Sequence, residues 1–302
     1  MKFNIRAKLT GRVFAFGAVF LMSLAPIVVK FGLRQALDPI PLLTVRFWLA
    51  AITLVIVVWI FDRSALRVPR GKWLPLVVVA LIFGLSFICY YVALSYIDAS
   101  IAHMLVAVSP AVVLLLLFFA GQKIGAKSVL RMGLVLAGLV LLVGPSGSLN
   151  LVGVAFGIAQ TLFYGAFLFF VERWLPDVPS NTITVYVDLV VAIQLSAVYA
   201  FLYREWQPMT TTGWGIIIFT GLFTTALAHF LYVSSVKAIG SGETALINPF
   251  ETVFTVTWAA IFLGERLTAI QWLGGGLILL SAFLISRRLA APLPVQKRPS
   301  TN

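Results

Sequence analysis

The sequence predicts an all-α integral membrane protein with ten transmembrane helices, arranged as two inverted five-helix repeats. Of its 302 residues, 61% are hydrophobic and only 11% are charged, whereas soluble domains carry about 25% charged residues. The apolar residues form ten runs, each close to the ~20 residues that a helix needs to cross a bilayer. Runs of the second half follow those of the first by 138 to 143 residues. Because five crossings is an odd number, the second repeat must start on the opposite side of the membrane.

The predicted spans alternate with short connections, and their backbone polar groups can be satisfied in lipid only by helices. The first repeat, residues 13–144, holds the spans 13–33, 42–61, 73–96, 101–120 and 128–144. The second repeat, residues 151–286, holds the spans 151–171, 183–203, 214–236, 244–263 and 269–286. The junction Gly144–Asn150 is free of charge and rich in turn-forming residues. Residues 1–12 form a short N-terminal segment, and the proline-containing residues 291–302 are expected to form a disordered tail.

The distribution of lysine and arginine sets the expected orientation. If the N-terminus is cytoplasmic, the segments 2–12, 63–72, 123–131 and 287–298 lie inside, and they hold most of the basic residues. The outer connections hold only Arg34, Arg204 and Arg266. This positive-inside bias predicts a multi-pass protein of the cell inner membrane with both termini in the cytoplasm. It also accounts for the net charge of +12, so no nucleic-acid partner is predicted.

Residues suited to metal binding or covalent catalysis are sparse. Cys89 is the only cysteine and lies within a span, so the sequence predicts no intramolecular disulfide and no thiolate cluster. Neither His103 nor His229 has a second histidine or a carboxylate at ligand spacing on its own helix. The chain contains no His-Glu-x-x-His, Gly-x-Ser-x-Gly or Walker motif. We therefore expect neither an enzyme nor a bound metal or cofactor.

Several short motifs resemble those of the drug/metabolite transporter superfamily, and specifically of its EamA-type members. They are Arg46, Tyr91-Val92-Ala93-Leu94, Pro110, Asn248-Pro249 and the turn Gly264-Glu265-Arg266. The resemblance covers residues 11–288, and the chain departs from it at Gly121-Gln122, where relatives commonly carry an acidic residue. The family implies secondary transport, often export, of small metabolites, with substrates that differ widely between members.

Glu251 is the strongest candidate for a substrate or proton site. It lies about seven residues into the ninth span, ~11 Å from the membrane boundary, where an ionisable group is costly. Asn248, Thr255 and Trp258 share its helix face at spacings of three and four. Pro249 frees a backbone carbonyl one turn earlier. The alternative is a protonated glutamic acid that only stabilises helix packing.

A second group of residues has candidate roles in coupling or in lining a cavity. Histidine titrates near neutral pH, so His103 and His229 are possible proton acceptors. Neutral imidazoles bonded to a neighbouring helix are an equally good interpretation. Tyr91, Tyr164 and Gln160 are candidate cavity residues, although buried tyrosines more commonly pack in the core with a bonded hydroxyl.

Two charged pairs occupy equivalent positions in the repeats. Arg46 corresponds to Asp188, and Lys30 to Glu172, both at an offset of 142 residues. For Arg46 and Asp188 we expect a structural pairing within the bundle. For Lys30 and Glu172, snorkelling to the nearest lipid headgroups is the simpler expectation.

These observations favour a secondary active or facilitative transporter. The leading hypothesis is an exporter of a small metabolite, such as an amino acid or a related compound, that works by alternating access at a midplane cavity between the repeats. The expected partners are a small-molecule substrate and the lipid bilayer, with protons as a further candidate, and the protein is expected to be a monomer or a homodimer. The alternative is a translocator of a lipid or lipid-linked sugar on the same fold. A membrane enzyme and a structural partner subunit are less favoured.

Overall fold

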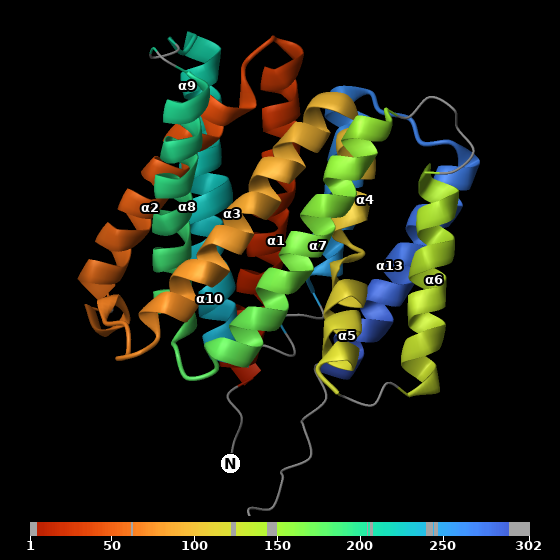
Figure 1. Cartoon of the computed structure of the whole chain (residues 1–302), viewed down its shortest axis with the longest axis horizontal. Helices are drawn as coiled ribbons and strands as arrows, with labels where there is room; N and C mark the ends of the chain where they lie inside the picture. Colours follow the sequence, from red (N-terminus) through yellow and green to blue (C-terminus); the bar gives the residue numbers. More distant parts are fainter. Residues whose placement is uncertain are drawn as a thin grey trace, which may run out of the picture.

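Every regular element in the described part of the chain is a helix (Figure 1). The computed structural model describes residues 5–61, 63–121, 125–143, 150–203, 205, 208–239, 244 and 247–289. The predicted tail 291–302, the junction residues 144–149 and Gln122 lie outside these residues. The all-helical prediction is therefore confirmed.

The helices of the first repeat follow the predicted spans. They are α1 (Ile5–Arg34), α2 (Pro39–Phe61), α3 (Trp73–Tyr96), α4 (Ala99–Val106), α5 (Ser109–Phe119) and α6 (Ala126–Val143), with a short 3-10 turn at Arg63–Leu66. The fourth span is thus divided into α4 and α5. The division lies just before Pro110, whose nitrogen cannot donate a backbone hydrogen bond to the preceding turn.

The second repeat also has two irregular spans. Its elements are α7 (Leu151–Trp174), α8 (Ser180–Leu202), α9 (Thr211–Phe219), the π-helical segment η2 (Thr220–Leu227), α10 (Ala228–Ile239), α12 (Pro249–Trp258), the π-helical segment η3 (Ala259–Leu263) and α13 (Ala269–Leu289). The eighth span consists of α9, η2 and α10. The ninth consists of α12 and η3, and it ends at Gly264, which has a left-handed φ of 68°. π-Helical turns are rare, and they occur frequently at functional sites.

The helices match the dimensions of a membrane. In the part of the chain that the structure describes, seven helices are long and apolar enough to cross a bilayer, and shorter apolar helices occupy the predicted fifth, ninth and tenth spans. Large apolar side chains such as Ile56, Val140 and Phe262 point outward. Lipid rather than water is the natural solvent for this surface.

Helix pairing shows how the repeats are related. Helix α2 packs against α8, and α6 against α13, so each of these helices meets its own equivalent in the other repeat. The pair α3–α7 corresponds in the same way to α1–α10, and α5–α7 corresponds to α1–α12. Replacing each helix by its equivalent in the other repeat gives the same set of contacts. This is the pattern expected when a two-fold axis relates the two repeats. Helix α1 begins at the lower side of Figure 1 and α7 at the upper side, so the repeats are inverted.

The two ends of the bundle are named here by α1. Its first residues and the last residues of α13 lie at the lower side of Figure 1, which we call the N-terminal end. Helix α1 finishes at Arg34 at the opposite end. The main buried apolar cluster lies between the repeats and includes Phe47, Tyr91 and Leu195. Cys89 is buried within the bundle.

Candidate functional site

A cavity of about 280 Å³ lies between the two repeats. Helices α1, α2, α3 and α4 supply one part of its wall, and α7, α8, η2, α10 and α12 supply the rest. Its lining extends to Leu168 near the end of α7, Ile183 near the start of α8 and Val233 on α10. These positions all lie toward the N-terminal end of the bundle. The cavity therefore extends from the middle of the bundle toward that end.

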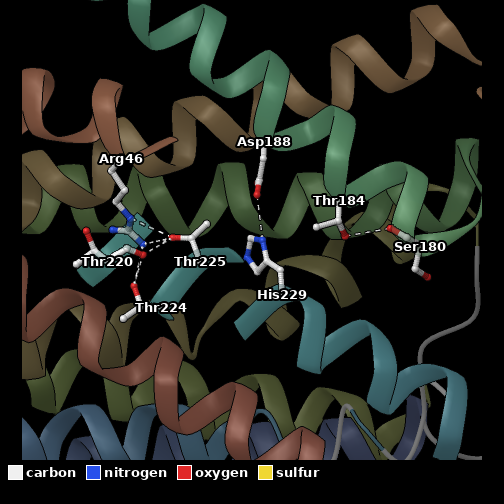
Figure 2. Close-up of polar contacts among 8 residues, drawn as sticks. All are labelled: Arg46, Ser180, Thr184, Asp188, Thr220, Thr224, Thr225 and His229. Carbon is white, nitrogen blue, oxygen red and sulfur yellow. Dashed lines mark hydrogen bonds and ion pairs between the residues drawn. The ribbon is translucent and has the colours of Figure 1, made fainter. Parts of the chain in front are cut away.

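Arg46 forms the first polar node of the cavity. Its Nε and Nη2 atoms donate to the Thr225 hydroxyl at 3.1 and 2.9 Å, and its Nη1 donates to the Tyr91 hydroxyl. A longer contact joins Nη2 to Thr224 at 3.5 Å. Figure 2 shows the guanidinium surrounded by these threonines. Arg46 is buried, and within the described residues no carboxylate lies at ion-pair distance from it.

The π-helical segment η2 explains how two adjacent threonines reach one guanidinium. The Thr220 carbonyl accepts hydrogen bonds from Thr224 at 2.9 Å and from Thr225 at 3.0 Å. The wider turn orients both hydroxyls toward α2, and each hydroxyl oxygen keeps the capacity to accept from Arg46. The cation is thus stabilised by neutral oxygens, which leaves its charge available to an anionic group of a ligand.

Asp188 and His229 form a second node, one turn further along the eighth span. The Nδ1 atom of His229 lies 3.1 Å from Oδ2 of Asp188, and Figure 2 shows the two side chains pointing at each other. Asp188 is only 1% exposed, and its Oδ1 has no hydrogen-bond partner among the described residues. A buried, unpaired carboxylate oxygen is costly unless a donor or a proton reaches it.

Glu251 and His103 form the third node. Their Oε1 and Nε2 atoms are 3.6 Å apart, and the Nδ1 atom of His103 lies 3.1 Å from the Tyr90 hydroxyl. Helix α4 carries His103, and α12 carries Glu251 in its first turn. At 3.6 Å the contact is within ion-pair distance but longer than a hydrogen bond. It joins a histidine of one repeat to a glutamate of the other.

Other predicted site residues complete the wall. Asn248 donates to the Tyr232 hydroxyl at 3.1 Å, which joins α12 to α10. Tyr164 and Gln160 both line the cavity from α7. The Gln160 side-chain oxygen accepts a hydrogen bond from Thr161 at 3.2 Å.

Two residues of the predicted polar face have a different position. Trp258 donates to the Ser23 hydroxyl at 3.1 Å, and the Thr255 hydroxyl lies 3.4 Å from the Ser23 carbonyl. Helix α1 crosses the ninth span at this level and covers both side chains. The predicted continuous face is therefore divided: Asn248 and Glu251 border the cavity, and Thr255 and Trp258 fix the span against α1.

The predicted pairing of Arg46 with Asp188 is wrong for this conformation. Each residue has the separate partners described above, although both line the same cavity. Helices α2 and α8 run antiparallel, and each has 23 residues. Arg46 lies ~10 Å from one end of the bundle and Asp188 ~12 Å from the other, so ~12 Å separates them along the helix axes.

The snorkelling expected of Lys30 is also wrong. Lys30 is buried, and its Nζ donates to the carbonyl oxygens of Leu94 at 2.5 Å and Ile97 at 2.7 Å. These carbonyls end α3 and have no partner within that helix. Glu172 is exposed near the end of α7, at the opposite end of the bundle from Lys30. The two residues therefore do not form a pair here.

Lys30 belongs to a set of contacts that the sequence did not predict. Arg34 donates to the Leu263 carbonyl at 2.8 Å. Glu265 accepts from the backbone N–H groups of Ala99 and Ser100, both at 2.9 Å, and from the Ser100 hydroxyl at 2.6 Å. We call Lys30, Arg34 and Glu265 the clasp. Each side chain satisfies backbone groups at a helix end on another span, so together they close the end of the bundle opposite to the N-terminal end.

Comparison with known proteins places this architecture in a family. The sequence profile of the EamA-like transporter family matches residues 9–144 and 151–287. An uncharacterized transporter of Archaeoglobus fulgidus is 27% identical over 282 residues, which cover 89% of this chain and 96% of the relative. The uncharacterized transporter YcbK of Bacillus subtilis is 21% identical over 290 residues, which cover 90% of this chain and 91% of the relative.

A solved crystal structure shows the same fold. It superposes with a TM-score of 0.63 at 17% identity, covering 92% of this chain and 98% of its own. Two matched family segments, one for each five-helix repeat, agree with the inverted duplication. The chain belongs to the EamA-like transporter family and is a multi-pass membrane transporter, not an enzyme.

Proposed function

We propose that the protein is a secondary carrier that exports a small metabolite, such as an amino acid or a related compound, by alternating access. The observation that carries this proposal is the central cavity between the repeats, which holds Arg46 together with the carboxylates of Asp188 and Glu251. Groups of both signs in one small space suit a zwitterion. Its anionic group binds Arg46, and its cationic group binds the free oxygen of Asp188.

The size and walls of the cavity support a small, partly apolar substrate. A volume of about 280 Å³ lies at the lower limit of the ~300–1,000 Å³ typical of ligand pockets. Phe83, Phe87 and Tyr164 provide apolar surface beside the charged nodes. A lipid or lipid-linked sugar, the alternative cargo, needs a long apolar slot next to its polar site. The charged walls of this cavity favour the small metabolite.

Alternating access follows from the asymmetry between the ends. The clasp closes one end, and the cavity extends to the other. We propose that the N-terminal end faces the cytoplasm in the cell inner membrane, with both chain termini inside. The substrate then enters from the cytoplasm, and opening of the clasp releases it outside. One chain contains both repeats, so a monomer suffices for this cycle, whether or not two copies associate.

We further propose that Glu251 and His103 carry the coupling proton. The pair joins α4 of one repeat to α12 of the other, so relative movement of the repeats changes their separation. The distance between the Glu251 carboxyl group and the His103 imidazole therefore depends on the conformation of the carrier. Proton binding and conformation are thereby linked.

Transport assays in proteoliposomes test this proposal. Glu251→Gln retains the size of the side chain and removes its charge change. We expect substrate exchange without a pH gradient to continue and the stimulation by a pH gradient to disappear. Glu172→Gln is the matched control because Glu172 is exposed, and it should behave like the wild type. Unchanged stimulation in Glu251→Gln would remove Glu251 from the coupling mechanism. Efflux of labelled lipid instead of small zwitterions would establish the alternative cargo.

A further inference from the structure

A second cavity, of about 290 Å³, lies beside the central one. Helix α2 supplies an apolar wall, and α8 and α10 supply walls that are partly polar. The lining residues are Leu54, Val57, Val58 and Phe61 of α2, Asn181, Thr184 and Val185 of α8, and His229, Phe230, Val233 and Ser234 of α10. We call this cavity the side fissure. Helix α2 packs against α8, α9 and η2 but makes little contact with α10. The two helices therefore diverge toward the N-terminal end, and the side fissure occupies the space between them.

The surface around the side fissure is apolar and faces outward. Phe223, Leu227 and Phe230 form an exposed stripe along the eighth span, and Phe230 is also part of the fissure wall. On the other side, Ile56 and Ile60 of α2 are exposed. Phe230 lies nine residues before the end of α10, ~13 Å from that end. At Phe230 the fissure therefore lies at the depth of lipid tails, and its other end, at Phe61 and Asn181, reaches the N-terminal end of the bundle.

The inner end of the side fissure meets the central cavity. Thr184, His229 and Val233 line both spaces. His229 is the partner of Asp188, and no aspartate, glutamate, lysine or arginine lines the side fissure among the described residues. The wall formed by α2 is apolar along its whole length, while Asn181 of α8 and Ser234 of α10 add two uncharged polar side chains to the other walls. The wall from Leu54 to Phe61 is ~10 Å long.

We propose that the side fissure is a binding site for one acyl chain of a bilayer lipid. Hydrocarbon is the available solvent at its mouth. Filling an apolar space of this size with hydrocarbon instead of water lowers the free energy of the system. A bound chain would keep α2 and α10 apart at the N-terminal end and would shield the Asp188–His229 pair from one side. This proposal concerns a resident lipid and does not depend on which compound is transported.

Spin-label accessibility in nanodiscs tests this proposal. A nitroxide is attached at Val57→Cys, on the fissure wall, in a Cys89→Ala background. Ile56→Cys is the matched lipid-facing control one residue away, and Arg70→Cys in an exposed loop is the aqueous control. We expect the Val57 label to collide with oxygen and to be protected from an aqueous nickel complex, as at Ile56.

A second label, at Ser234→Cys on the opposite wall of the side fissure, provides an independent reading if the first variant does not fold. Relaxation of either label by a lipid that carries a paramagnetic group on its acyl chain would support the proposal directly. If either label were as accessible to the nickel complex as the label at Arg70 is, the proposal would be overturned and the fissure would be a water-filled vestibule. Protection from both oxygen and nickel would also overturn it, because protein would then fill the space.

Discussion

The two ends of the helix bundle use similar bonds in different surroundings. At the end where α1 finishes, Lys30 donates to two carbonyls at the end of α3, and both Lys30 and Glu265 of the clasp are buried, whereas Arg34 is exposed. At the N-terminal end, Lys72 donates to the Trp174 carbonyl at the end of α7 at 2.8 Å. That bond is exposed, and its ion-pair partner Asp177 lies 3.9 Å away on the surface.

Burial makes these similar bonds unequal in energy. A hydrogen bond to a buried charged group contributes about 1.5–3 kcal/mol, whereas an exposed ion pair contributes about 0–1 kcal/mol. The bonds at the clasp end should therefore resist opening more strongly than the exposed bond at the N-terminal end, toward which the central cavity and the side fissure extend. Among the residues that the structure describes, only the clasp end carries charged side chains that are buried at helix termini, and this makes the symmetric scaffold asymmetric.

The largest expected effect comes from breaking the clasp at Glu265. Glu265→Ala leaves the buried N–H groups of Ala99 and Ser100 without their acceptor, a cost of about 2–4 kcal/mol. The closed end should then open more often, and amide hydrogen exchange in the first turn of α4 should accelerate by about 30- to 1,000-fold. Glu172→Ala, which removes an exposed acid at the other end, is the control. Unchanged exchange in α4 would show that Glu265 does not hold this end closed.

The comparison of Lys30 with Lys72 can be tested directly by matched substitutions. Lys30→Met leaves the Leu94 and Ile97 carbonyls unpaired in the bundle and should lower stability by about 1–3 kcal/mol. Lys72→Met should lower it by less than about 1 kcal/mol. Thermal unfolding in nanodiscs measures both. Equal losses would contradict the difference between the ends.

A smaller effect is expected at the centre, which lies between these two ends. Thr225→Val removes the hydroxyl that accepts two of the Arg46 bonds. The guanidinium then loses its orientation, and we expect the substrate KM to rise about tenfold, which corresponds to ~1.4 kcal/mol. Thr257→Val is the control because that threonine bonds only its own helix at an exposed position. Transport kinetics that change in kcat alone would argue against a binding role.

The smallest expected effect concerns Asp98, in the connection between α3 and α4. Burial raises the pKa of Asp98, and the nearby Glu265 raises it further, while Lys30 and Arg34 oppose the rise. A raised pKa in the folded state means that the charged carboxylate destabilises the fold at neutral pH, and that this penalty disappears as the pH falls through the folded-state value. Asp98→Asn should therefore slightly raise Tm at pH 7 and make Tm less dependent on acid pH. A lower Tm at pH 7 would contradict this assignment.

Much of the fold could be predicted from the sequence because lipid imposes a simple rule on long apolar runs. The positions of the spans and the inverted duplication follow from the length of each run and the odd number of crossings. The depth of Glu251 and the equivalence of Arg46 with Asp188 also singled out residues that meet at one cavity.

The remaining features depend on contacts between distant helices. The π-helical segment η2 adds a residue to a turn without changing the apolar pattern, so the sequence did not show how Thr224 and Thr225 reach Arg46. Lys30 was expected at the headgroups because the carbonyls that bind it are 64 and 67 residues away in the chain. The Gly264-Glu265 turn was visible as a motif, but its role in capping α4 required the three-dimensional structure.

Side-specific labelling of the central cavity tests the proposed alternating access most directly. Ser86 lines the cavity from α3, so Ser86→Cys in a Cys89→Ala background provides a single reactive thiol. A small, charged methanethiosulfonate reagent is applied to vesicles of either orientation. We predict labelling from the N-terminal side alone for the resting protein, and labelling from the opposite side when Glu265→Ala is added. Labelling of the resting protein from the clasp side, or equally from both sides, would contradict the proposal.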